Sequence, residues 1–163
     1  MSSNKNAAAK EFSWPVRVYY EDTDSGGVVY YANYLKFMER ARTELLRSIG
    51  YEQDQLQQEL GIIFAVHSAN IQYKKPARFN NELNVLTSIT SLGKASIHFK
   101  QSIYLERSPD VTVSTGLASP ELPAELLSEA EIKIACLNAT KFTPQSIPAS
   151  VIEKINEEFY RGS

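Results

Sequence analysis

Between residues 34 and 137 the spacing of apolar residues changes from the period of a helix to the period of a strand. Between residues 34 and 49 apolar side chains recur every three or four positions, and from residue 63 to residue 137 they mostly alternate with polar ones. The helical set is Tyr34, Met38, Ala41 and Leu45, widened by Leu35, Phe37, Leu46 and Ile49. Such a wide apolar stripe must be covered on several sides, and strands with one apolar face can cover it. The pattern predicts an α+β domain in which an antiparallel β-sheet wraps around one long central helix.

The ends of this helix carry ordinary signals. We expect Asn33 to cap it and Gly50 to end it, because asparagine favours the N-cap and glycine favours the position after the last turn. Arg40 and Glu44 stand four residues apart and are expected to pair on its exposed side.

Five segments are predicted to be strands: 14–20, 63–73, 83–92, 95–105 and 128–137. Pro15 suits the beginning of a strand or an edge strand, and the short connection at 92–94 makes the third and fourth a hairpin. Residues 52–60 are predicted to form a short helical connector, and the segment after Pro148 an amphipathic helix. The sets expected to share one face of their strand are Ile63, Ala65, His67, Ala69, Ile71 and Tyr73; Leu83, Val85, Thr87 and Ile89; Ala95, Ile97, Phe99 and Ile103; and Ala130, Ile132, Ile134 and Cys136.

The domain organisation is simple. With 163 residues, 43% of them hydrophobic, the chain can build one core. Residues 1–13 are polar and small and are expected to be a flexible tail, so that 14–163 forms a single domain. The stretch 107–126 contains three prolines and is expected to be an extended loop.

Several functional classes are disfavoured by composition. The net charge is −2 and the basic residues are scattered, so binding to nucleic acid is not expected. No run of about 18 apolar residues could span a bilayer, and residues 1–12 contain no apolar leader core. Cys136 is the only cysteine, which excludes an intrachain disulfide and fits a buried, inert thiol in a reducing compartment. We therefore expect a cytoplasmic protein.

The stretch VYYEDTDSGGVVYYANY, residues 18–34, gathers three carboxylates ahead of the helix: Glu21, Asp22 and Asp24. An acidic turn suits the positive end of a helix dipole, which would be a purely structural explanation. The alternative explanation is that one of these residues is a catalytic carboxylate beside a helix N-terminus.

The longer run VRVYYEDTDSGGVVYYANYLKFMERARTELLR, residues 16–47, resembles the opening motif of the YbgC branch of the 4-hydroxybenzoyl-CoA thioesterase group, in the hotdog-fold superfamily. The resemblance continues through YKKPARF, residues 73–79, to about residue 140. It implies a hotdog fold, in which a curved sheet encloses the helix, and the activity of an acyl-CoA thioesterase.

The resemblance also implies roles for individual residues. Asp24 corresponds to the catalytic carboxylate, acting as nucleophile or general base, and the backbone amide at Tyr31 to the donor that polarises the thioester carbonyl. Gly26 and Gly27 would form the turn between them. Tyr20 matches a tyrosine that accompanies the aspartate, although a core or interface aromatic is an equal alternative.

This chain departs from the family pattern at one position. Close YbgC relatives often have a histidine where this chain has Tyr31, and a histidine base is therefore in doubt. We do not expect His67 or His98, in strand patterns far along the chain, to be catalytic. Asp22 is assigned to capping or turn structure and Glu39 to the helix surface.

Coenzyme A carries phosphates that call for basic residues. By resemblance Lys94, in the 92–94 turn, is a candidate, and Lys74, Lys75 and Arg78 are further ones, with solvated surface charge the alternative for all four. No metal or redox cofactor is expected, since coenzyme A is part of the substrate. The resemblance further implies a homodimer, often a homotetramer, with active sites in the dimer interface. It also implies an association with the Tol-Pal envelope system or with phospholipid synthesis.

Two other functions compete with thioester hydrolysis. A hotdog hydratase or dehydratase would want a paired Asp and His, and no histidine lies near the motif. A non-catalytic acyl-CoA-binding or scaffold protein is favoured by the missing histidine and disfavoured by Asp24 and the Gly-Gly turn. The sequence leaves the acyl group open.

Overall fold

The computed structural model describes residues 10–106 and 124–160. The elements in chain order are β1 (Phe12–Arg17), the 3₁₀ turn η2 (Tyr20–Asp22), α1 (Asn33–Ser48), α2 (Gln53–Gln55), the π-helical turn η3 (Leu56–Leu60), β2 (Ile62–Tyr73), β3 (Glu82–Leu92), β4 (Ser96–Leu105), β5 (Glu125–Asn138) and α3 (Ala149–Glu158). The strands form one antiparallel sheet in the order β1-β3-β4-β5-β2.

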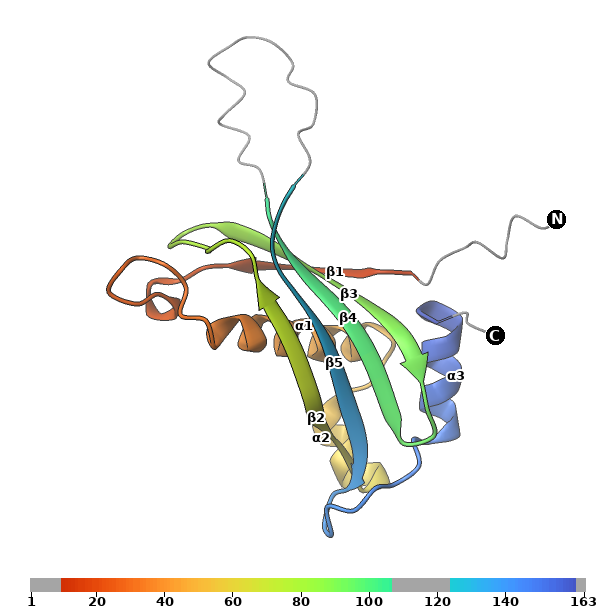
Figure 1. Cartoon of the computed structure of the whole chain (residues 1–163). Coiled ribbons are helices and arrows are strands. Elements are labelled where there is room, and N and C mark those ends of the chain that lie inside the picture. The colour runs from red at the N-terminus through yellow and green to blue at the C-terminus, as the bar shows by residue number, and fades with distance from the viewer. Residues whose placement is uncertain (1–9, 107–123, 161–163) are drawn as a thin grey trace, which may run out of the picture.

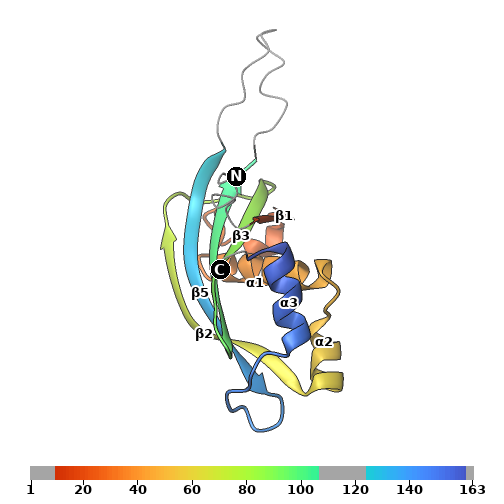
Figure 2. The same cartoon turned by 90° about the vertical axis from the view of Figure 1, so that its right-hand side faces the viewer.

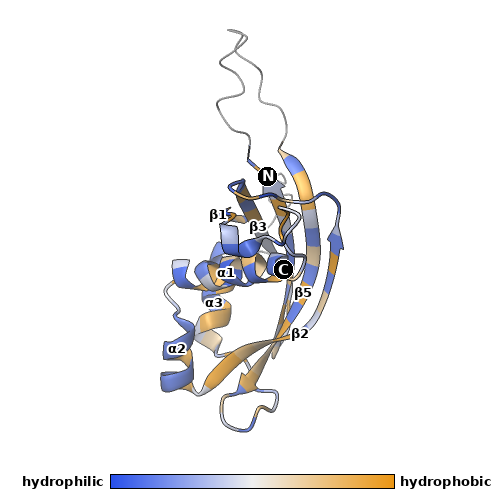
Figure 3. Ribbon diagram, turned by 90° about the vertical axis from the view of Figure 1, so that its left-hand side faces the viewer, coloured by the Kyte–Doolittle hydropathy of each residue, from blue (hydrophilic) through white to orange (hydrophobic). Residues whose placement is uncertain are grey.

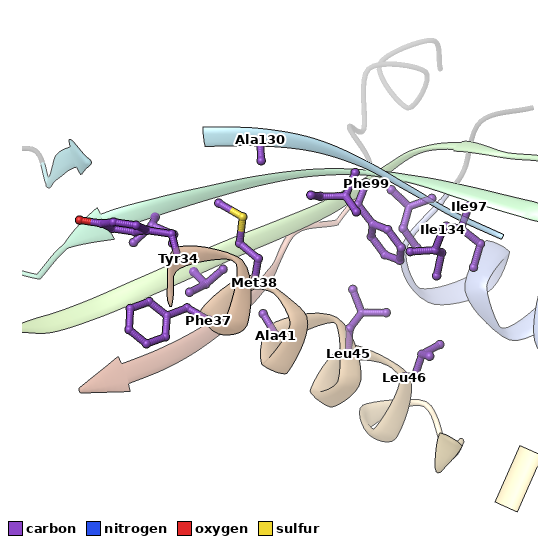
Figure 4. Close-up of a cluster of buried hydrophobic side chains, with 14 of the residues drawn as sticks. Tyr34, Phe37, Met38, Ala41, Leu45, Leu46, Ile97, Phe99, Ala130 and Ile134 are labelled. Atoms are coloured by element: carbon purple, nitrogen blue, oxygen red, sulfur yellow. The ribbon is translucent and has the colours of Figure 1, made fainter. Parts of the chain in front are cut away.

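The sheet curves around α1, with α3 on the same side (Figures 1 and 2). Met38, Ala41 and Leu45 of α1 are fully buried and point toward the sheet, where they meet Phe99 and Ile134 (Figure 4). Most of the wide stripe on α1 is thus enclosed, although Leu35 remains 37% exposed. The expected architecture is confirmed. The connector at 52–60, the β3–β4 hairpin and the C-terminal helix are also where the sequence predicts them.

The ends of α1 only partly follow the sequence signals. Gly50 follows the helix with φ at +98°, a conformation that glycine adopts readily, as expected. Asn33 is not the N-cap: it is the first helical residue, Ala32 is the cap, and the Asn33 side chain reaches back to Asp22. The Arg40–Glu44 pair is also wrong, because Glu44 pairs with Arg47 and the Arg40 guanidinium lies 6.0 Å from the centre of the Phe37 ring.

The alternation of β2 shifts phase in mid-strand. Val66 faces Ile134 and Ser68 faces Lys133 on β5, so His67 is an extra, bulged residue. Phe64 and Val66 therefore share the inward face with Ala69, Ile71 and Tyr73, and the expectation that Ile63, Ala65 and His67 belong to that face is wrong. Along β5, by contrast, hydrophobic and hydrophilic residues alternate as expected (Figure 3).

The first strand starts and stops earlier than expected. It begins at Phe12 and ends at Arg17, and Pro15 stands on the edge strand of the sheet, as predicted. Residues 12–13 of the expected tail thus belong to β1, and residues 125–126 of the expected loop to β5. The rest of both predictions falls mostly on 1–9 and 107–123, outside the described residues.

In the parts of the chain that the structure describes, no helix is long and apolar enough to cross a membrane.

Candidate functional site

Two carboxylates of the acidic run differ in their surroundings: Asp22 is buried and forms part of the loop structure, and Asp24 is exposed to solvent. Asp22 is buried, its Oδ2 accepts a hydrogen bond from the Tyr19 N–H at 2.8 Å, and its carbonyl accepts from the Tyr30 N–H at 3.1 Å and from Asn33 Nδ2 at 2.9 Å. Asp22 is therefore turn structure, as expected. The bond from Tyr19 closes the η2 turn, and the two bonds to the Asp22 carbonyl join η2 to the start of α1.

Asp24 stands on an exposed turn two residues later. Its N–H donates to the Val28 carbonyl at 2.9 Å, and its own carbonyl accepts from the Gly27 N–H at 3.0 Å. Oδ1 accepts from the Gly26 N–H at 2.8 Å, which fixes the carboxylate toward the Gly-Gly turn. Gly27 has φ at +81°, so the turn requires glycine at this point. The backbone thus holds a solvent-accessible carboxylate in one orientation.

The peptide between Tyr30 and Tyr31 supplies a donor at the start of α1. The Tyr30 carbonyl accepts from the Asn33 N–H at 2.8 Å, so it points along the helix. In a trans peptide the Tyr31 N–H points the opposite way, outward from the helix N-terminus. Among the described residues no acceptor bonds to this N–H. An unpaired amide at the positive end of a 16-residue helix suits a developing negative charge.

Tyrosine rings cover the surface beside this amide. The Tyr31 ring is 4.8 Å from that of Tyr30 and 6.0 Å from that of Tyr73, and Tyr73 is 5.4 Å from Tyr34, all between ring centres. A groove of about 250 Å³ is lined by Val29, Tyr31, Tyr34, Tyr73, Lys74, Lys75 and Pro76. In the sequence, Tyr73 shows only as a strand-face residue at the start of the YKKPARF stretch. That stretch leads from β2 toward β3 and lies beside the motif loop, residues 18–32, a contact between distant parts of the chain that the sequence pattern does not reveal.

Three tyrosines at or beside this groove, Tyr30, Tyr34 and Tyr73, have raised pKa values. Burial is the main cause that raises the pKa of Tyr34, opposed by the N–H that Ala77 donates to its oxygen. Burial also raises the pKa of Tyr73, with smaller contributions from the neighbouring Tyr31 and Tyr34. The pKa of Tyr30 is raised mainly by its hydrogen bond with Tyr31. These phenols therefore keep their protons, and the groove offers apolar faces with hydroxyl donors.

The connection from β2 to β3 passes beside the motif loop (Figure 1). The Val29 N–H donates to the Ala77 carbonyl at 2.8 Å, and Val28 forms an antiparallel bridge with Arg78. This places Arg78 next to the Gly-Gly turn. Arg78 makes no ion pair with a described carboxylate, so its charge is available.

The other basic candidates lie in different surroundings. Lys74 and Lys75 line the groove, but Lys75 Nζ is 2.6 Å from Glu125 and Lys74 Nζ is 3.5 Å from Glu129, so their charges are partly offset. Lys94 lies in the β3–β4 hairpin at the other end of the sheet, and within one protomer it is not brought to the loop (Figure 1).

Tyr20 lies outside the Tyr31 groove. Its side chain is 81% exposed and its ring meets Phe79 edge-on at 5.7 Å, in a separate surface groove of about 660 Å³ that also contains Arg17 and Asn80. A core role is therefore wrong, and the interface and substrate-contact alternatives stand.

Neither histidine joins the loop. His67 is the exposed bulge residue of β2, and His98 faces away from α1, between Ser91 on β3 and Lys133 on β5. In the described ranges, no three His, Cys, Asp or Glu side chains are grouped in a way that could hold a metal ion.

Comparisons with known proteins show the family to which this chain belongs. The model of the Thioesterase superfamily matches residues 26–112. The chain is 38% identical over 146 residues to the acyl-CoA thioester hydrolase YbgC of Escherichia coli, covering 90% of this chain and 96% of that protein. It also resembles the crystal structure of a probable thioesterase from Bartonella henselae, at 30% identity and a TM-score of 0.70, covering 85% of this chain and all of that one. A mutant 4-hydroxybenzoyl-CoA thioesterase in complex with 4-hydroxybenzoyl-CoA shares the fold, with a TM-score of 0.74 at 20% identity over 90% of this chain and 99% of that one.

Proposed function

Because this chain belongs to the Thioesterase superfamily, and within it to the YbgC acyl-CoA thioesterases, we propose that it hydrolyses acyl-CoA to a free acid and coenzyme A through Asp24 and the Tyr31 amide. Family membership makes the chain an enzyme with a hotdog fold. The residue roles are our inference, and the observation that carries them is the open carboxylate of Asp24 on the turn that leads to the unpaired Tyr31 N–H.

The proposed reaction needs two groups and water. The thioester carbonyl accepts a hydrogen bond from the Tyr31 N–H, which stabilises the negative charge that develops on its oxygen. Asp24 either attacks the carbonyl carbon, giving an anhydride that water then opens, or removes a proton from the attacking water. In both routes the C–S bond breaks, and the coenzyme A thiolate leaves and takes up a proton. This route requires no metal ion and no redox cofactor.

The tyrosine at position 31 fits this scheme. The proposed donor is the backbone N–H, which every residue except proline supplies, so the reaction does not depend on a histidine side chain here. The pKa of Tyr30 is raised, mainly by its hydrogen bond with Tyr31, so the Tyr30 phenol stays protonated around neutral pH. The Tyr30 phenol therefore does not compete with Asp24 as a base.

A homodimer would complete the site. Asp24 is not among the residues that line the Tyr31 groove, and Lys94 stands at the far end of the sheet from both. The strands β1 and β2 are the edges of the sheet, and Val66 on β2 is 55% exposed. A second protomer along such an edge could supply a groove wall and a basic hairpin.

The test is thiol release from short-chain, long-chain and aromatic acyl-CoAs by the wild type and by Asp24→Asn. Amide for carboxylate keeps the size of the side chain and removes the base, so we expect turnover to fall at least about a hundredfold, in the range of a lost general base. Glu21→Gln is the matched control, since it removes a neighbouring exposed carboxylate outside the turn. Full activity of Asp24→Asn would refute the assignment of Asp24, and absence of thiol release by the wild type would refute hydrolysis of these substrates.

A further inference from the structure

Tyr73, the last residue of β2, is bonded to the residue that carries the proposed oxyanion donor. Its hydroxyl donates to the Tyr31 carbonyl at 3.2 Å, across 42 positions of sequence. Tyr73 is 44% exposed, so core packing does not account for this contact.

The aromatic rings of these tyrosines are also in contact. Tyr73 meets Tyr31 edge-on at 82° and Tyr34 at 62° between ring planes. Tyr34, in the first turn of α1, is in turn fixed by the N–H that Ala77 donates to its hydroxyl at 2.9 Å. The end of β2 and the segment that follows it therefore contact the start of α1 through Tyr73 and through the bond from Ala77 to Tyr34.

The consequence for the Tyr31 N–H follows from peptide geometry. That N–H belongs to the peptide whose carbonyl, on Tyr30, is held by the Asn33 N–H. The next peptide carries the Tyr31 carbonyl, which accepts a rather long bond of 3.3 Å from the Tyr34 N–H and the bond from Tyr73. With both planes fixed, the two rotatable bonds of Tyr31 are fixed as well, and the N–H keeps one direction.

We propose that Tyr73 is a positioning residue that orients the Tyr31 amide toward the thioester oxygen, through its hydroxyl bond to the Tyr31 carbonyl and its ring contacts with Tyr31 and Tyr34. This proposal rests on the proposed function, since it assigns the amide a part in the reaction. Preorganised donors act at the transition state, where the oxygen is most negative, more than on the bound substrate. Loss of the hydroxyl should therefore affect kcat more than KM.

The experiment compares Tyr73→Phe with Tyr51→Phe under saturating and limiting acyl-CoA. Tyr73→Phe keeps the ring and removes one hydrogen-bond donor. Tyr51 follows the other end of α1, is half-buried, and its hydroxyl has no partner among the described residues, so the same change there tests the loss of a phenol alone. We expect kcat to fall about three- to tenfold in Tyr73→Phe, the size of one neutral hydrogen bond, with KM and the unfolding midpoint unchanged. Tyr51→Phe should match the wild type.

Amide hydrogen exchange and the thiol-release assay of Asp24→Asn distinguish failure of this proposal from failure of the proposed function. Amide hydrogen exchange at residues 30–34 should rise in Tyr73→Phe, because the turn has lost a bond. If kcat stays at the wild-type value, or falls only together with the unfolding midpoint, Tyr73 is not a positioning residue. If Asp24→Asn is fully active, or the wild type releases no thiol, the proposed function fails first, whatever Tyr73→Phe does.

Discussion

The side-chain amide of Asn33 donates to the main-chain carbonyl of Asp22 over 2.9 Å, joining the first residue of α1 to the acidic loop eleven positions before it. The bond is part-buried, and the same Asp22 carbonyl also accepts a hydrogen bond from the Tyr30 N–H. An asparagine that looks like a helix cap thus acts on the loop and not on its own helix.

The first prediction concerns this bond. Asn33→Ala should lower the free energy of unfolding by about 1 kcal/mol, the usual value of a hydrogen bond, and should lower kcat severalfold because the loop that carries Asp24 is less fixed. Urea unfolding and thiol release measure the two effects. Asn70→Ala, an exposed asparagine on β2, is the control and should change neither. An Asn33→Ala enzyme with unchanged kcat would show that the bond serves stability alone.

Glycine 27 offers a test of loop geometry that separates strain from catalysis. Gly27 and Gly61 have similar positive φ values, +81° and +67°, and an added Cβ would meet no atom within 4 Å at either. Alanine at either position should therefore cost about 1 kcal/mol of stability through backbone strain alone. Only Gly27→Ala should also lower kcat, because only that glycine shapes the turn under Asp24. Equal turnover in the two variants would argue against a role for the turn.

Periodicity predicted the helix and the sheet because burial imposes one period on each element. It failed at His67, where the bulge changes the phase of β2 without any glycine or proline to mark it. The extra residue is decided by pairing with β5, which is a contact between distant parts of the chain. One-strand patterns do not contain that information.

The geometry of the candidate site could be predicted where it depends on neighbouring residues, and not where it depends on contacts between distant parts of the chain. Asp24 and the Gly-Gly turn stand within four residues of each other, so the motif shows them together. Tyr73 reaches Tyr31 only after β2 has paired with the sheet, and a tyrosine at a strand end looks like any half-buried aromatic. Gln101 was missed for a related reason: a glutamine breaks an apolar alternation, although here it is fully buried.

Gln101 connects the sheet to α1 in the core. Its Nε2 donates to the Met38 carbonyl at 3.0 Å and to Thr87 Oγ1 at 2.9 Å, and its Oε1 accepts from Arg42 at 2.9 Å. Burial is the main cause that lowers the pKa of Arg42, opposed by the charge of Glu39. The charged side chain thus depends on Gln101 for a partner.

The stability prediction follows from that dependence. Gln101→Leu should cost about 2–4 kcal/mol of unfolding free energy, because a buried cation loses its acceptor, and Arg42→Met should cost less, because only a neutral oxygen is left unpaired. The double variant should cost less than the sum of the two. Urea unfolding of all four proteins gives the coupling energy. Additive losses would mean that the two side chains do not depend on each other.

Cys136 should be inert toward thiol reagents in the folded protein. The side chain is fully buried, and burial raises its pKa to about 11. The reactive thiolate is thus scarce at pH 8 in the folded state, and more abundant after unfolding, when the pKa returns to the usual range. Because the pKa of Cys136 is higher in the folded state than in the unfolded state, the folded state holds the thiol proton more tightly. The contribution of Cys136 to stability is complete below the unfolded pKa and is lost as pH rises toward 11. Labelling with a chromogenic disulfide should therefore require denaturant at pH 8, and rapid labelling of the native enzyme would contradict the burial.

The last prediction concerns which cation would bind the coenzyme A phosphates. Among the described residues Arg78 lacks a carboxylate partner and adjoins the motif loop, while the exposed Arg17 is paired with Glu82 at 2.6 Å. A phosphate gains more from the unpaired guanidinium. We expect Arg78→Gln to raise KM for acyl-CoA about three- to tenfold at low salt with kcat unchanged, and Arg17→Gln to have little effect.

The substrate itself supplies the decisive control. An acyl thioester of N-acetylcysteamine has the same reacting group and no phosphate, so Arg78→Gln should leave its KM unchanged. The difference between the two substrates should also shrink as salt is added, because screening weakens an exposed charge–phosphate contact. An equal rise in KM for both thioesters would mean that Arg78 supports the loop through its bridge to Val28 and does not bind the nucleotide end.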